Sequence, residues 1–81
     1  AYPNPFNPMT TISFEIPDEI NFVELSIYDL NGKKVENLFK GDLNKGQYKY
    51  DWNAKNYSSG IYFVKIISNN KQLTQKITLI K

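Results

Sequence analysis

The chain lacks cysteine, histidine and arginine among its 81 residues. Without cysteine and histidine it has no disulfide, no thiolate nucleophile and no imidazole for a catalytic relay or a metal site. Without arginine it lacks the planar fork that binds phosphate and guanine, and a net charge of +2 is too small to predict a nucleic-acid surface. The motifs GxGxxG and HExxH are also missing. We therefore expect no enzyme, no metal and no cofactor.

Long hydrophobic runs are also missing, since the longest, such as Ile61 to Val64, fall far short of the roughly 18 residues of a membrane helix. The sequence after Ala1 has no signal-peptide pattern, so we expect residue 1 to be a processing boundary and residues 1–81 to be one domain of a longer protein. Hydrophobic residues make up 41% of the chain and aromatics 15%, which is enough for a packed core.

Alternation of apolar and polar residues with period two recurs along the chain, whereas helical periodicity is almost absent. This pattern predicts an all-β, immunoglobulin-like β-sandwich of about seven short antiparallel strands, with a small barrel as the rival fold. The expected strands are 2–4, 11–16, 22–30, 33–39, 47–52, 61–68 and 73–80. Between them we expect Pro17 to end a strand and the polar, glycine-bounded residues 41–46 to form a loop.

Several positions give finer predictions. Asn31-Gly32 and Asn69-Asn70 indicate tight turns, and the broken alternation after Lys33 indicates a bulge. Residues 61–68 are apolar on both faces except at Lys65, which is typical of a central strand. In residues 73–80, Leu73, Ile77 and Leu79 alternate with polar residues.

The aromatic residues Tyr48, Tyr50 and Trp52 alternate along one expected strand and offer two interpretations. An exposed row would suit sugar stacking, as in a carbohydrate-binding module, but so small a domain needs its large side chains in the core. We favour the core, with Trp52 and Tyr62 as its largest members.

Carboxylate and amide side chains cluster at Asp29 and Asn31, and again at Asp51 and Asn53. Calcium needs six to eight oxygen ligands from a defined loop, and neither cluster has that form. Because both clusters adjoin expected turns, we predict that these side chains bond the local backbone instead.

The N-terminal stretch 2–8 holds three prolines, at positions 3, 5 and 8. It fits the letter of a PxxP ligand, but Tyr2 and Phe6 look like apolar anchors. We therefore expect an irregular first strand that covers a sheet edge.

Four blocks of the sequence, taken in order, resemble the C-terminal sorting domain of the type IX secretion system. They are YPNPFNPMTTISFEIP at 2–17, VELSIYDLNGKKV at 23–35, the stretch from Gly46 to Trp52 with SGIY at 59–62, and KITLIK at 76–81. The immunoglobulin-like domain of the flagellar hook-cap protein is a similar architecture. Two residues depart from the usual pattern of the family, Ala54 where glycine is common and Lys33 where arginine is common.

The resemblance implies a non-catalytic signal at the C-terminus of a secreted protein from Gram-negative bacteria of the Bacteroidetes type. The implied partners are the upstream cargo domain, the outer-membrane translocon and the sortase of that system. The implied location is the periplasm in transit, followed by the outer-membrane surface or the medium.

The resemblance also implies which residues partners recognise and which residues maintain the fold. The segment recognised by partners is expected to be Lys76, Ile77, Thr78, Leu79, Ile80 and Lys81. The structural residues of the family motif are Tyr2, Pro3, Asn4, Pro5, Tyr28, Asp29, Gly32, Gly46, Trp52, Gly60 and Tyr62. Two other functions stay open: a carbohydrate-binding or adhesive accessory module of a secreted glycosidase, and a structural spacer like the hook-cap relative.

Overall fold

The computed structural model describes residues 3–69 and 71–80, with the side chains of residues 18–21 left aside. It contains four strands: β1 (Met9–Asp29), β2 (Lys34–Asn53), β3 (Gly60–Ser68) and β4 (Lys71–Leu79). They form one antiparallel sheet in the order β2-β1-β3-β4. The all-β prediction is confirmed. The described residues include no helix of the length and apolarity needed to cross a membrane.

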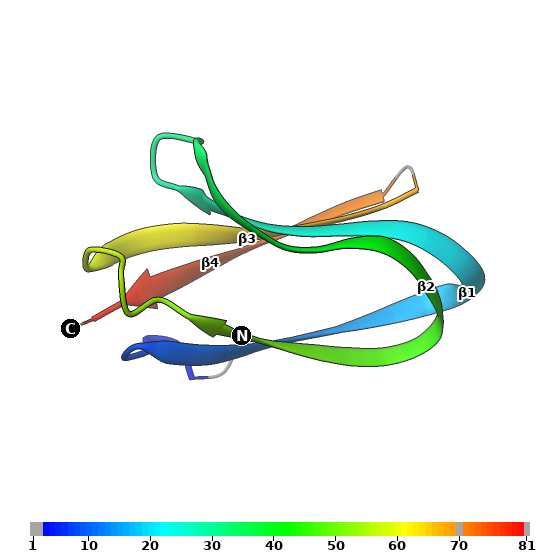
Figure 1. The fold of residues 1–81 in the computed structure, drawn as a ribbon, viewed down its shortest axis with the longest axis horizontal. Helices are drawn as coiled ribbons and strands as arrows, with labels where there is room; N and C mark the ends of the chain where they lie inside the picture. Colours follow the sequence, from blue (N-terminus) through cyan, green and yellow to red (C-terminus); the bar gives the residue numbers. More distant parts are fainter. Residues whose placement is uncertain (1–2, 70, 81) are drawn as a thin grey trace.

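The two longest strands bend in the middle, and this bend builds the core. The first half of β1 pairs with the second half of β2, and the second half of β1 pairs with the first half of β2 and with β3. Figure 1 shows the resulting hairpin curling so that its halves face each other. Apolar residues alternate along both halves of β1, and their shared inner side is buried.

The bend explains why the seven-strand sandwich is not confirmed. The pairing register between β1 and β2 breaks after Ile16↔Gly46 and resumes at Ile20↔Asn44. Pro17 lies in this break, where its missing amide hydrogen removes no ladder bond, so β1 continues through the proline instead of ending there. Residues 41–46 are likewise part of β2, which corrects the predicted loop. Strands that were expected to be separate are thus continuous.

The N-terminal stretch is not a regular strand. Residues 3–5 form bends, and Phe6 makes one isolated parallel bridge to Leu79 of β4. Prolines cannot donate to a ladder, so the expected strand at 2–4 is wrong for its described part, and Tyr2 lies outside the described residues.

Most of the finer predictions within the sheet are confirmed, whereas the predicted Asn69-Asn70 turn includes Asn70, which lies outside the described residues. The tight turn between β1 and β2 contains Asn31-Gly32, with Gly32 at φ 85°, where a side chain would be strained. Two register shifts leave Val35 and Leu38 of β2 without a partner opposite, which confirms the bulge. β3 lies between β1 and β4, as expected for a central strand. Leu73 is the exception, because it is 67% exposed.

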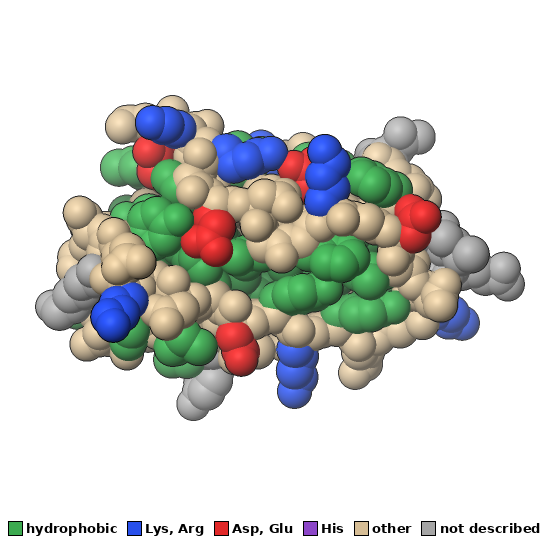
Figure 2. Space-filling view, in the orientation of Figure 1, with side chains coloured by type: hydrophobic (Ala, Val, Ile, Leu, Met, Phe, Trp, Pro, Cys, Tyr) green, Lys and Arg blue, Asp and Glu red, His purple; other side chains and the backbone are tan. Residues whose placement is uncertain are grey.

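The core joins both halves of the curl. Its largest member is Trp52, which is 1% exposed and packs against Phe6, Tyr57 and Tyr62 with ring centroids 5.5–5.6 Å apart. Along β2, partly buried hydrophobic side chains complete it. Figure 2 shows hydrophobic side chains in the band between the two halves of β2.

Candidate recognition surface

The predicted recognition segment divides between core and surface. Ile77 and Leu79 are almost fully buried, whereas Lys76 is exposed and Ile80 is half exposed. Thr78 lies between these extremes, and Lys81 lies outside the described residues. This split follows from strand geometry, because successive side chains of β4 point to opposite faces of the sheet. Only the side chains of Lys76 and Ile80 are therefore open to a partner within the described part of the segment.

The backbone edge of this segment is already occupied by the N-terminal stretch. The Asn4 side chain donates from Nδ2 to the Lys76 carbonyl (3.0 Å) and accepts at Oδ1 from the Thr78 amide (2.9 Å). Phe6 then donates its amide to the Thr78 carbonyl (3.0 Å) and accepts from the Ile80 amide (2.9 Å). The interpretation of this stretch as a cover for a sheet edge fits, and the PxxP interpretation does not, because Phe6 is 2% exposed.

The remaining motif residues hold turns and core. The Asp29 carboxylate accepts from the amides of Asn31 and Lys33, both at 2.9 Å, and the Asn53 side chain accepts from the Lys55 amide at 2.9 Å. These contacts confirm the turn interpretation for Asp29 and Asn53. Asp51 differs, because its carboxylate accepts from the Thr11 hydroxyl of the neighbouring strand at 2.7 Å. The Tyr62 hydroxyl donates to the Ser58 carbonyl at 2.7 Å.

Other members of the motif mark strand ends and bends. Gly46, paired with Ile16, is the first β2 residue paired after the register break, and Gly60 begins β3. The carbonyl of Pro3 accepts from the Thr10 hydroxyl at 2.8 Å, and Pro5 is exposed. These contacts place the motif residues at strand ends and bends.

The aromatic row does not form a flat platform. Trp52 is buried, and Tyr48 and Tyr50 are half-buried, each stacked on the Phe14 ring at 5.7 and 6.0 Å. The core interpretation is therefore confirmed for Trp52 and Tyr62.

A carboxylate that the sequence did not single out supports this aromatic core. Glu36 accepts hydrogen bonds from Trp52 Nε1 and from the Tyr57 hydroxyl, both at 3.0 Å. Burial, together with this contact to a carboxylate, raises the pKa of Tyr57 above 10.0.

The outer face of the sheet gathers lysines that are dispersed in the sequence. By register, Lys34 and Lys40 of β2, Lys65 of β3 and Lys76 of β4 lie on the same face as Tyr28 of β1. Lys65 Nζ lies 4.5 Å from the centre of the Tyr28 ring, a cation–π contact. Sequence spacing alone could not reveal this grouping, because it depends on the strand order and the two bulges.

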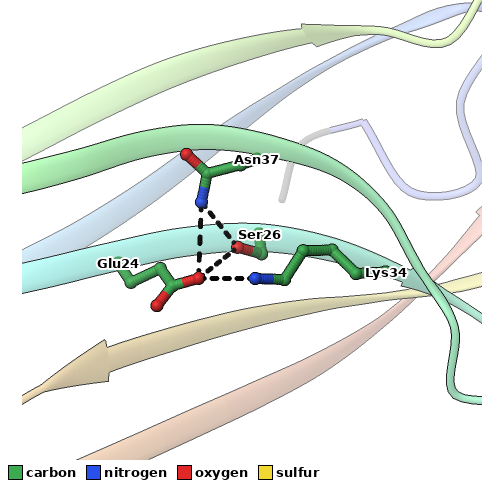
Figure 3. A network of polar contacts seen from close by, with 4 residues as sticks. All are labelled: Glu24, Ser26, Lys34 and Asn37. Atoms are coloured by element: carbon green, nitrogen blue, oxygen red, sulfur yellow. Dashed lines mark hydrogen bonds and ion pairs between the residues drawn. The ribbon is translucent and has the colours of Figure 1, made fainter.

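One polar network on this face is shown in Figure 3, where the side chains of Lys34 and Asn37 converge on Glu24 and Ser26. Lys34 Nζ donates to Glu24 Oε2 at 2.7 Å, and Asn37 Nδ2 donates to Ser26 Oγ at 2.9 Å. The hydrogen bond from Lys34 lowers the pKa of Glu24 and, reciprocally, raises the pKa of Lys34. Glu24 therefore neutralises Lys34 within this face.

Comparison with known proteins completes the assignment. No curated protein matches the chain. The family model described as secretion system C-terminal sorting domain matches residues 1–81, the whole chain. Together with an all-β fold whose motif residues build turns, edge cover and core, this match identifies the chain: it belongs to the secretion system C-terminal sorting domain family and is a C-terminal sorting signal for type IX secretion.

Proposed function

We propose that the domain acts without chemistry of its own, and that the export machinery reads it through its terminal segment, residues 76–81. The partners proposed are the outer-membrane translocon, then the sortase, with the cargo attached upstream as part of a larger secreted protein. A type IX sorting signal implies export to the cell surface or the medium, and we propose that the folded domain passes through the periplasm on the way.

The observation that supports this proposal is the alternation of buried and exposed side chains along the end of β4. Ile77 and Leu79 anchor the strand in the core, while Lys76 and Ile80 project from it. A rigid sheet thus presents alternate side chains of one short segment at fixed spacing, which is how extended segments are commonly recognised. The curled sheet also supports, as a proposal, the immunoglobulin-like relationship to the hook-cap domain.

The test is a reporter fusion in a host that carries the type IX system. The wild-type domain is fused to the C-terminus of an inert periplasmic reporter, and the reporter is measured at the cell surface and in the medium. Deleting Lys81 together with Lys76→Ala should reduce export while the melting temperature stays within a few degrees of wild type, because Lys76 is exposed.

The matched control is Lys49→Ala, at an exposed position in the second half of β2, outside the terminal segment. Undiminished export by the Lys76 and Lys81 variant would place the recognised surface elsewhere. Retention of the wild-type fusion in the periplasm, although it is folded, would refute the sorting role itself.

A further inference from the structure

The outer edge of β4 is occupied along only half of its length. The groups that bond the N-terminal stretch belong to Lys76, Thr78 and Ile80, which shows that the even-numbered residues of β4 direct their backbone groups outward. Because this direction repeats every second residue, Gln72 and Thr74 direct theirs outward too. No strand of the described chain pairs with them there.

The first half of β4, whose outer edge is unpaired, is also exposed to solvent on both faces of the sheet. All six side chains from Lys71 to Lys76 are exposed, including Leu73 at 67%. Figure 1 shows the start of β4, in orange, at the far end of the molecule from its red C-terminal end, which the N-terminal stretch accompanies. About five residues are open, roughly the length of an ordinary strand.

The other edge of the sheet, β2, is protected against pairing with strands of other proteins. β2 carries bulges at Val35 and Leu38, a register break at its centre and lysines at 40, 45 and 49. Such features prevent pairing with foreign strands. Between Lys71 and Lys76, β4 has the uncharged run Gln-Leu-Thr-Gln, without proline or bulge. This edge is therefore open to an added strand.

The charge of β3 and β4 indicates what kind of segment the open edge of β4 would bind. All eight carboxylates of the chain lie within residues 1–51, whereas residues 52–81 hold five lysines and no carboxylate. β3 and β4 are consequently of one sign, and the open edge is bounded by Lys71 and Lys76. An acidic segment would meet attraction along the whole hairpin, and a basic one repulsion.

We propose that residues 71–75 accept an extended, acidic segment of the export machinery as an additional strand of the sheet. The backbone groups of Gln72 and Thr74 would bond the incoming strand, Leu73 would supply an apolar contact, and Lys71 would attract its carboxylates. This inference rests on the proposed sorting function and adds a second contact, upstream of the terminal segment, with the chemistry of its partner.

The first test removes the outward amide. In the reporter fusion, Thr74→Pro deletes a hydrogen-bond donor that faces solvent and leaves the bonds of neighbouring residues to β3 in place. Its control, Thr74→Val, keeps the amide and the branched side chain. We expect Thr74→Pro to lower the exported fraction about tenfold, the effect of losing roughly one good hydrogen bond, and Thr74→Val to export normally.

The second test uses charge and does not depend on how well the proline variant folds. Lys71→Glu should lower export several-fold, whereas Lys49→Glu, with the same change in net charge, should not. Equal export by these two variants overturns the acidic partner, and wild-type export by a folded Thr74→Pro variant overturns strand addition. Both results leave the sorting role intact, whereas retention of the wild-type fusion refutes that role and this inference together.

Sedimentation of the isolated domain tests whether a second copy of this chain occupies the open edge instead. A wild-type dimer that becomes monomeric in the Thr74→Pro variant would show that the edge pairs with a second copy, which also overturns the acidic partner.

Discussion

Truncating Phe6 tests whether the N-terminal stretch is part of the fold. Phe6 is 2% exposed, its ring centroid lies 5.5 Å from that of Trp52, and its backbone bonds β4 twice. Replacing a buried phenylalanine by alanine costs about 3–5 kcal/mol, through lost burial and the cavity that remains. A domain of this size has a total stability of about 4–12 kcal/mol, so the loss is a large share of it.

The assays are urea and thermal unfolding, both followed by the fluorescence of Trp52, the one tryptophan in the chain. Urea unfolding of Phe6→Ala should show the loss of about 3–5 kcal/mol, and the melting temperature should fall by on the order of 12–40 °C, given about 4–8 °C per kcal/mol in small domains. Phe6→Leu, which fills most of the cavity, should lose less and stay measurable if the alanine variant is unfolded.

The control is Phe22→Ala, because Phe22 is 49% exposed and should cost under about 1 kcal/mol. A loss below about 1 kcal/mol for Phe6→Ala would refute the reasoning, since the stretch would then be an appendage that a partner could remove freely.

Two further predictions concern Tyr57 and Asn4. Because the folded-state pKa of Tyr57 is raised above 10.0, its contribution to stability is present below pH 10 and is lost as pH rises through the folded-state value. Urea unfolding from pH 9 to 11 should therefore show a smaller alkaline loss for Tyr57→Phe than for wild type, and parallel profiles would contradict this. Asn4→Ala removes the acceptor of the Thr78 amide, so that amide should exchange its hydrogen faster by NMR, whereas exposed Asn7→Ala should not change it; unchanged protection in Asn4→Ala would show that the Asn4 contact is dispensable.

The burial of the proposed recognition segment, residues 76–81, affects how it can be tested by mutagenesis. Substitutions at Ile77 or Leu79 remove core side chains, so any loss of export could come from unfolding of the domain. Substitutions at Lys76 or Lys71 change only exposed side chains. Variants of the second kind, with melting temperatures measured beside export, are therefore the ones that separate recognition from folding.

The local pattern of residues was enough to predict the all-β class, the turn at Asn31-Gly32, the bulge after Lys33 and the burial of Trp52. Each of these depends on neighbours in the chain: alternation sets which face is apolar, and glycine or asparagine permits a tight turn. The family blocks likewise sit in the sequence itself, and the family match over the whole chain agrees with them.

Tertiary structure decided everything that depends on which strands become neighbours. Pro17 resembles a strand end locally, but it lies in the register break between β1 and β2, where no ladder bond is lost. Residues 41–46 resemble a loop locally, yet most of them pair with residues 16–23 of β1. Leu73 alternates like a core residue but is exposed, because it lies on the bare half of an edge strand. The cover that Asn4 places on β4 joins residues more than seventy positions apart, a distance that no local pattern spans.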